Sequence, residues 1–253
     1  MVLKERCIHC LRKFDKLTRD HILPKSYYTN LTPSQTELWT APSCENCNSH
    51  LGRIEQNCLT PLILSMNSKA DADSPTSAIR QRVLRSFNAN AASNEHDRKV
   101  RAGRVRKFLK SILRSDGRTE GVFPGFGYHP EWKPEEQYLI PIPADGLNKI
   151  GQKIIKGIEY KLEKRYIDQS FELKVFFCHE NKIGDVLNLI RQNGQHHVVA
   201  PGFEFYRMAP FDKKYCLYEI RIWDKLVIYG SLMKKSWWQQ IFSLNFIRFK
   251  LFA

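Results

Sequence analysis

The chain has 253 residues, of which 42% are hydrophobic, enough apolar material for a core in one or two domains. Its formal net charge of +14 favours polyanionic partners, nucleic acid first and an anionic membrane surface second. No apolar run approaches the about 18 residues of a transmembrane helix. Seven cysteines and no signal peptide fit a reducing compartment rather than a disulfide framework, so we expect a cytoplasmic protein.

Two Cys-x-x-Cys pairs, Cys7 with Cys10 and Cys44 with Cys47, stand near the start of the chain. Two intervening residues let a tight turn aim both sulfurs at one ion, and four thiolates complete a tetrahedral zinc site. The alternative is four ordinary buried thiols, which would require both pairs to share this spacing by chance. The pattern therefore predicts a structural Zn²⁺ that holds a long loop at its base.

Between the pairs lies the segment LTRDHILPKSY, in which a short strand carries Asp20 and His21. Adjacent side chains of a strand point to opposite faces, so a bend near Pro24 is needed to bring both to one site. A histidine accepts a proton near neutral pH, and a carboxylate holds a hard divalent cation. Asn48 follows the last cysteine at the start of an expected helix and offers a second oxygen ligand.

The sequence C-x-x-C, D-H-I-x-P and C-x-x-C-N over residues 7–52 resembles the HNH endonucleases, which have a ββα-metal core and a four-cysteine zinc. The resemblance implies that His21 is the general base that activates water. It also implies that Asp20 and Asn48 bind a catalytic Mg²⁺ or Mn²⁺. On the same grounds the expected substrate is DNA rather than RNA.

The family's middle asparagine, which steadies the catalytic histidine, is replaced here by Trp39. Asn30, Asn46 or a backbone carbonyl are the alternatives for orienting His21. Tyr27, Tyr28 and Trp39 either form the core of the zinc module or contact nucleic acid, and packing is the preferred interpretation for Trp39.

His50 lies two residues beyond Asn48, about 200° round the helix, and is either a metal or phosphate contact or an exposed residue. Gly52 stands one turn after Asn48, where a second helical ligand would be expected, and leaves that place to water or to Glu55. Pro61 predicts a kink or an end of the helix.

The middle of the chain is strongly basic. Helices are expected over 78–87 and about 105–113, with a break over 88–94. The many arginines and lysines of this segment fit a phosphate backbone, whereas the alternative is a solvated charged face. The segment 117–144 is rich in proline and glycine and is expected to be a linker.

The last part predicts a helix with an apolar stripe from Leu147 to Ile158, a strand over 171–178 and a helix over 183–192. Strands over 203–208, 215–223 and 225–232 follow, which suggests an antiparallel sheet with helices on one face. His179, His196 and His197 share no ligand spacing and are expected at turns or edges. The aromatic end of the chain, 236–253, is expected to pack or to form a dimer surface.

The expected fold is α+β, with four parts. They are a zinc-bound HNH module (1–68), a basic helical segment (69–116), a linker (117–144) and a C-terminal α+β accessory domain (145–253). The expected function is a metal-dependent DNA endonuclease, and a homodimer would permit double-strand cleavage. The C-terminal domain is a candidate sensor of a trigger or partner. The alternative is a zinc-stabilised nucleic-acid-binding or adaptor protein whose nuclease site has decayed.

Overall fold

The computed structural model describes residues 5–66, 76–114, 133, 137–178, 180–210 and 214–235, and it confirms a mixed α and β chain. The helices are α1 (Glu45–Ser65), α2 (Ser77–Phe87), α3 (Glu95–Ser111), α4 (Ala144–Glu163) and α5 (Gly184–Asn193). The short strands are β1 (Glu5–Arg6), β2 (Lys13–Phe14), β3 (Thr18–His21), β4 (Thr40–Ser43), β5 (Leu113–Arg114) and β6 (Tyr138–Leu139). Most of the expected linker, His179 and the segment 236–253 lie outside the described residues.

The N-terminal part consists of two short antiparallel pairs, β1 with β2 and β3 with β4, followed directly by α1. Cys44 is the N-cap residue of α1, so the second knuckle forms its first turn. The sequence predicted a kink or an end of the helix at Pro61, and the end is wrong, because α1 continues to Ser65. Pro61 and the following Leu62 and Ile63 are buried, and this packing holds the last turn despite the lost N–H donor.

The C-terminal part is a five-stranded antiparallel sheet in the order β7-β11-β10-β9-β8. Its strands are β7 (Phe171–Phe176), β8 (Gln195–Ala200), β9 (Phe203–Met208), β10 (Tyr215–Ile222) and β11 (Leu226–Lys234). The sequence indicated all of them except β8, which carries His196 and His197 at one edge of the sheet.

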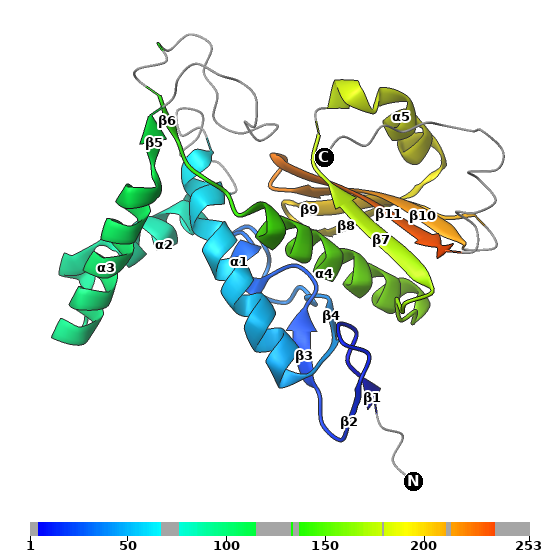
Figure 1. Cartoon of the computed structure of the whole chain (residues 1–253), viewed down its shortest axis with the longest axis horizontal. Helices are drawn as coiled ribbons and strands as arrows, with labels where there is room; N and C mark the ends of the chain where they lie inside the picture. Colours follow the sequence, from blue (N-terminus) through cyan, green and yellow to red (C-terminus); the bar gives the residue numbers. More distant parts are fainter. Residues whose placement is uncertain are drawn as a thin grey trace.

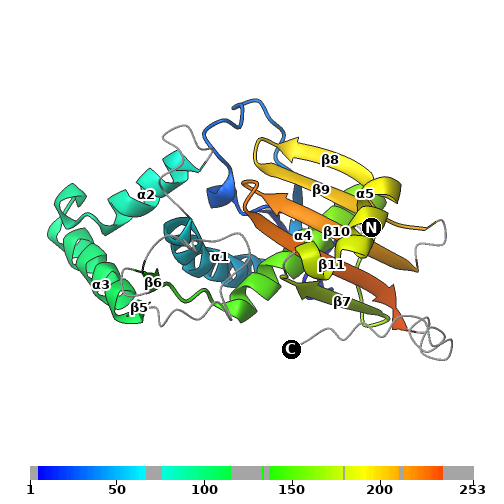
Figure 2. The same ribbon diagram turned by 90° about the horizontal axis from the view of Figure 1, so that it is seen from above.

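The two helices of this part cover opposite faces of the sheet (Figure 2), not one face as expected. Tyr218 of β10 donates a hydrogen bond to Glu159 of α4, and the next residue, Glu219, accepts from Arg191 of α5. Neighbouring side chains of a strand point to opposite sides, so α4 and α5 must lie on different faces. The α4 face is the apolar one, and it is the face that turns toward the zinc module.

Helix α4 lies between α1 and the sheet (Figure 1) and packs on both. A single hydrophobic core runs through all three, since Ile22 after β3, Ile154 on α4 and Phe205 on β9 belong to one buried cluster. The backbone of α4 comes close to the zinc module at Gly157, where an added Cβ would lie 2.6 Å from Cγ1 of Ile22. The zinc module and the C-terminal sheet therefore share their interior, although the predicted boundary near residue 144 stays a prediction.

The aromatic residues of the loop between β3 and β4 support this joint core. Tyr27 and Tyr28 are buried, and the indole N–H of Trp223 donates to the backbone carbonyl of Tyr27 at 2.6 Å. Trp39 packs edge-on against Phe205 with ring centroids 5.9 Å apart. The three residues therefore pack between the loop and the sheet, as the first of the two alternatives, core packing rather than nucleic-acid contact, predicted. Among the described residues, no helix is both long and apolar enough to cross a bilayer.

Candidate functional site

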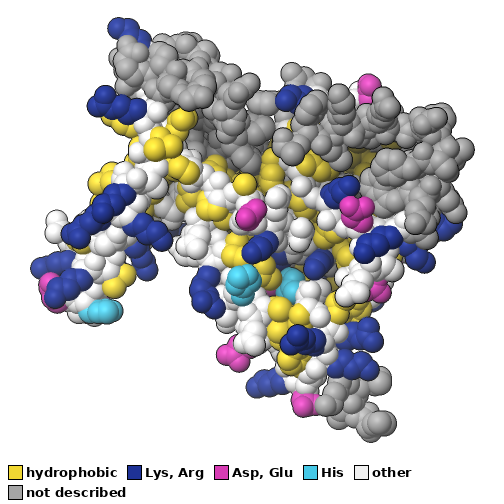
Figure 3. Space-filling view, in the orientation of Figure 1, with side chains coloured by type: hydrophobic (Ala, Val, Ile, Leu, Met, Phe, Trp, Pro, Cys, Tyr) yellow, Lys and Arg dark blue, Asp and Glu magenta, His cyan; other side chains and the backbone are white. Residues whose placement is uncertain are grey.

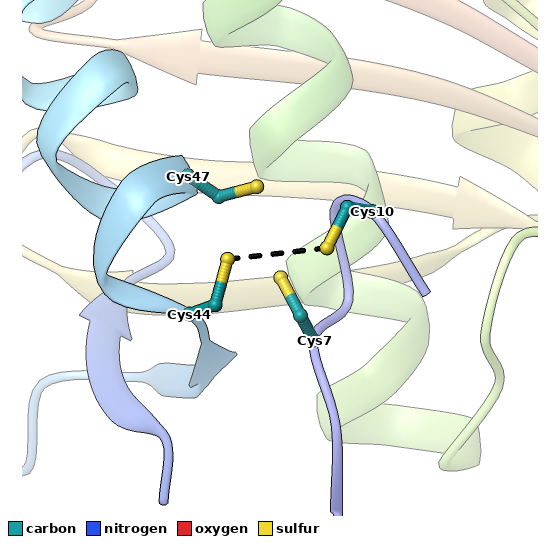
Figure 4. A group of neighbouring side chains, drawn as sticks. All are labelled: Cys7, Cys10, Cys44 and Cys47. Carbon is teal, nitrogen blue, oxygen red and sulfur yellow. Dashed lines mark hydrogen bonds between the residues drawn. The ribbon is translucent and has the colours of Figure 1, made fainter. Parts of the chain in front are cut away.

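The four cysteines of the two knuckles come together at the N-terminus of α1 (Figure 4). Cys7 and Cys10 stand on the turn that follows β1, and Cys44 and Cys47 on the first turn of α1. Their four Sγ atoms all lie within 4.8 Å of one another. The predicted four-cysteine cluster is therefore present, built from two segments more than thirty residues apart in sequence.

The spacing of the sulfurs fits a zinc ion. Sγ of Cys10 and Sγ of Cys44 are 3.9 Å apart, close to the about 3.8 Å edge of a tetrahedron with Zn–S bonds of about 2.3 Å. The distance is far too long for a disulfide. Burial raises the pKa of Cys7, but nearby backbone N–H groups outweigh it and lower that pKa to about 7. Burial and the neighbouring thiols raise the pKa of Cys10 and Cys47, so in these two residues the thiolate form depends on a bound cation. Metal binding releases such protons, and the four residues could hold Zn²⁺.

Asp20 lies on β3, opposite Ala41 of β4, and is 5% exposed. Its Oδ2 accepts a hydrogen bond from Nε2 of His9 at 3.0 Å, and its Oδ1 accepts from Nζ of Lys153 at 2.8 Å. Burial opposes ionisation, but the bond from His9 and the charge of Lys153 outweigh it and lower the pKa of Asp20. Asp20 is therefore an ionised carboxylate with both oxygens already bonded.

Lys153 of α4 is 3% exposed and also forms an ion pair with the carboxylate of Glu55 on α1. Burial raises the pKa of Glu55, and the neighbouring ammonium offsets part of this rise. We call His9, Asp20, Glu55 and Lys153 the buried charge cluster. It joins the first knuckle, β3, α1 and α4 around one ammonium group, and Glu55, the alternative to water as a further cation ligand, is bonded there to Lys153.

The buried charge cluster bears directly on the expected catalytic cation. A divalent cation bound by Asp20 would need one of its carboxylate oxygens, and one is bonded to Lys153 and the other to His9. In this arrangement the residues do not fit such a cation, because the ammonium of Lys153 occupies the position beside the Asp20 carboxylate that the cation would need. Binding would require Lys153 to move away. Whether Asp20 is a metal ligand stays a prediction.

His21 is the next residue on β3 and points to the other side of the strand. It is half-buried, and its Nδ1 atom is buried without a hydrogen-bond partner among the described residues. Burial, followed by the charges of Lys25 and Lys153, lowers the pKa of His21. Neither Asn30 nor Asn46 supplies the missing partner, and the side chain of Trp39 packs on the sheet instead. Within the described residues, no side chain orients His21 through Nδ1, and its lowered pKa favours the neutral form.

Asn48 lies on α1 and its Nδ2 donates to Oγ1 of Thr18 at 3.1 Å. Thr18 and Asp20 alternate on β3, so they share one face of the strand, and Asn48 is on the side of Asp20. The amide oxygen of Asn48 accepts no hydrogen bond within the described part of the chain. The structure therefore brings Asn48 and Asp20 to the same side, with His21 on the other.

A hollow of about 190 Å³ opens between α1 and α4 beside the knuckles. The side chains that line it are predominantly basic: His9, Cys47, His50, Leu51, Lys149, Gln152, Lys153 and Lys156. His50 is exposed, which agrees with the surface alternative, and it stands at this hollow rather than beside Asp20. Figure 3 shows histidine and lysine or arginine side chains gathered over this part of α1 and α4.

The sequence interpretation missed Lys153 and His9. A usable signal for Lys153 was present: Gly146, Lys153 and Gly157 fall within an arc of about 40° on α4. Two glycines on one helical face mark a close approach, and both do pack tightly, against Cys58 and Ile22. A lysine between them is forced into the same contact. For His9 the only signal was its position inside the first knuckle.

Comparisons of the chain with protein families, with curated proteins and with solved structures found no match. Any inference about function therefore depends on the four cysteines and on the residues around them.

Proposed function

We propose that this chain is a DNA endonuclease of the HNH type, in which His21 is the general base that takes a proton from the attacking water. The observation that supports this proposal is the order of β3, β4 and α1 beside the four-cysteine cluster. Their arrangement places Asp20 and His21 on the strand and Asn48 on the helix beside it. The lowered pKa of His21 supports the role, since a general base must be neutral at the working pH.

The resemblance also assigns a Mg²⁺ or Mn²⁺ to Asp20 and Asn48. Such an ion would offset negative charge on the scissile phosphate. In the described arrangement the ammonium of Lys153 is bonded to Asp20, so Asp20 could hold such an ion only if Lys153 moved away. The net charge of +14 supports nucleic acid as the polyanionic substrate.

A second candidate is a zinc-stabilised nucleic-acid-binding protein whose nuclease site has decayed. Two observations favour it. The ammonium of Lys153 neutralises Asp20 from within the fold, and Nδ1 of His21 has no orienting partner. In this case the buried charge cluster would be a structural fastening between α1, β3 and α4 rather than an inhibited active site.

The test is plasmid cleavage by zinc-loaded protein with added Mg²⁺, with added Mn²⁺ and with neither. Strong chelators are left out because they would also remove structural zinc. His21→Ala is compared with His196→Ala, which changes a histidine on β8, an edge strand of the sheet. Cation-dependent nicking that His21→Ala abolishes and His196→Ala retains supports the nuclease. No cleavage with either cation, together with salt-sensitive DNA binding by both variants, supports the second candidate.

A further inference from the structure

Helices α2 and α3 form an arm that projects from the side of the molecule (Figure 1). They pack through Phe87 and Phe108, whose ring centroids are 5.4 Å apart. Arg101 fastens the turn between them by donating to the backbone carbonyls of Arg85 and Asn88. No residue of α3 is buried, so this helix contributes almost nothing to the common core. Its sequence must therefore be explained by something other than packing.

One face of α3 carries four residues spaced by four, three and four positions: Lys99, Gly103, Arg106 and Lys110. At 3.6 residues per turn they fall within about 60° of arc and extend over about 16 Å of helix. We call them the cationic stripe. Phe108 is nine positions from Lys99, about 180° round, so the stripe faces away from α2. All four residues are exposed, and Figure 3 shows lysine and arginine side chains spaced along the arm.

The cations of the stripe have no partner in the described part of the chain. The two acidic residues of α3 are already used: Glu95 pairs with Arg98 and Asp97 with Arg101. Lys99, Arg106 and Lys110 form no ion pair or hydrogen bond there. Glu95, one turn before Lys99, lies on the same side of the helix, but beyond this first turn the face carries cations only. A merely solvated helix surface usually alternates charges of both signs for mutual support. Within the described residues, no carboxylate balances the charge of Lys99, Arg106 and Lys110.

Gly103 lies in the middle of the stripe. Nothing is within 4 Å of a Cβ built on it, so no neighbour within the fold requires a glycine there. Glycine weakens a helix interior relative to alanine, which makes this an unfavourable choice for α3 on its own. A glycine between cations does, however, let the axis of a partner approach the helix backbone more closely than any side chain would allow.

We propose that the cationic stripe binds the phosphate backbone of DNA, with Gly103 at the point of closest approach. The inference rests on the proposed function for its choice of DNA as the polyanion. Lysine and arginine side chains on one exposed helical face contact phosphates without reading bases, so the stripe binds DNA irrespective of sequence. It holds the substrate on the arm while the zinc module lies to one side of it, and it works in the same way in the nuclease and in the pure binding protein.

The experiment measures binding of a fluorescent DNA duplex over a range of salt concentrations, without Mg²⁺ or Mn²⁺ so that cleavage plays no part. The test variant is Lys99→Gln/Arg106→Gln/Lys110→Gln. Each lost phosphate contact reduces the slope of log affinity against log salt by about 0.9. We expect the slope to fall by about three and the affinity to fall by about tenfold or more at moderate salt.

The matched control removes three exposed cations from the C-terminal part, in the variant Lys182→Gln/Lys225→Gln/Lys235→Gln. It loses the same net charge and should keep most of the slope. An equal loss in both triple variants would mean that only net charge matters and would overturn the proposal. So would a stripe variant that keeps its DNA affinity but no longer binds vesicles of phosphatidylserine, since the partner would then be a membrane.

Gly103→Leu tests the contribution of close approach to DNA affinity independently of charge, because the substitution leaves the net charge unchanged. Leucine favours the helix, so thermal unfolding of the arm should move to higher temperature while DNA affinity falls severalfold. Unchanged affinity with a raised unfolding temperature would remove Gly103 from the contact and overturn this element of the proposal. If the unsubstituted protein binds DNA through the stripe but cleaves none, the nuclease proposal fails and the proposal for the cationic stripe holds.

Discussion

The Nζ atom of Lys153 lies 2.8 Å from Oδ1 of Asp20, across 133 residues of sequence. Both side chains are almost fully buried. Removing one partner of a buried ion pair leaves an uncompensated charge, which typically costs about 3–5 kcal/mol. We therefore expect Lys153→Met to lower the free energy of unfolding by about 3 kcal/mol or more in urea denaturation of the zinc-loaded protein. Lys149→Met, one turn earlier and exposed, should change it by less than about 0.5 kcal/mol.

The same substitution tests the competition between Lys153 and a divalent cation. Without the ammonium, the carboxylates of Asp20 and Glu55 face each other with no positive charge between them, an arrangement that favours a cation. We expect Lys153→Met to bind Mn²⁺ at least about tenfold more tightly than the unsubstituted protein, as followed by the electron paramagnetic resonance signal of free Mn²⁺. The additional substitution Asp20→Asn should abolish the gain. Equal Mn²⁺ affinity with and without Lys153 would show that the two do not compete.

The four-cysteine cluster predicts one zinc ion per chain. Cys10→Ala should reduce the zinc content measured by elemental analysis to near zero and destabilise the N-terminal part, because the ends of its long loop are then no longer joined. Cys178→Ala is the matched control, since Cys178 lies beyond β7, outside the cluster, and should retain zinc. A full complement of zinc in Cys10→Ala would place the ion elsewhere.

The lowered pKa of His21 gives a sign for the pH dependence. Burial and the charges of Lys25 and Lys153 favour the neutral imidazole, so it stays neutral to a lower pH than an ordinary histidine with its pKa of about 6.5. The acid limb of kcat/KM for plasmid nicking should then have its midpoint below about pH 6.5. A midpoint above that value would mean that His21 is not the group that titrates.

Because α4 packs closely on the residue that follows β3, replacing a glycine of α4 by alanine should destabilise the protein rather than stabilise the helix. A Cβ at position 157 would lie 2.6 Å from Cγ1 of Ile22, so Gly157→Ala should destabilise by about 1–3 kcal/mol although alanine favours a helix. Gly52→Ala on α1 meets nothing within 4 Å and should stabilise by up to about 1 kcal/mol. Thermal or chemical unfolding of the two variants gives opposite signs if α4 is seated as described.

The sequence predicted those parts of the structure that local spacing controls. The two Cys-x-x-Cys pairs predicted the cluster, the apolar stripe of 147–158 predicted α4, and Asn193-Gly194 marked the end of α5. Strand alternation made Asp20 and His21 point apart unless a bend near Pro24 joined them, and on β3 they do lie on opposite sides. These features depend on residues a few positions from one another, for which the periodicity of helix and strand is sufficient.

Contacts between distant segments were beyond this kind of inference. Nothing near Asp20 indicates that Lys153 will lie against it, because the contact depends on how α4 is seated between α1 and the sheet. The sequence did not indicate β8 because its first three residues, Gln-His-His, show no alternation of apolar and polar side chains. The strand forms by pairing with β9, which lies next to it in the sheet. The sequence also does not indicate which face of the sheet α5 covers, and it was expected on the same face as α4. The hydrogen bond from Arg191 to Glu219 shows that α5 lies on the opposite face.

The distance in sequence between Asp20 and Lys153 also sets an order of events during synthesis. Chains elongate at about 5–20 residues per second, so Lys153 is added roughly 7–27 s after Asp20. Cys47 is added long before it, and all four zinc ligands are therefore present early. For that interval the growing chain carries a complete set of thiolates and an Asp20 carboxylate that has no ammonium beside it. Metal ions in the surrounding solution thus meet this carboxylate before its own lysine does.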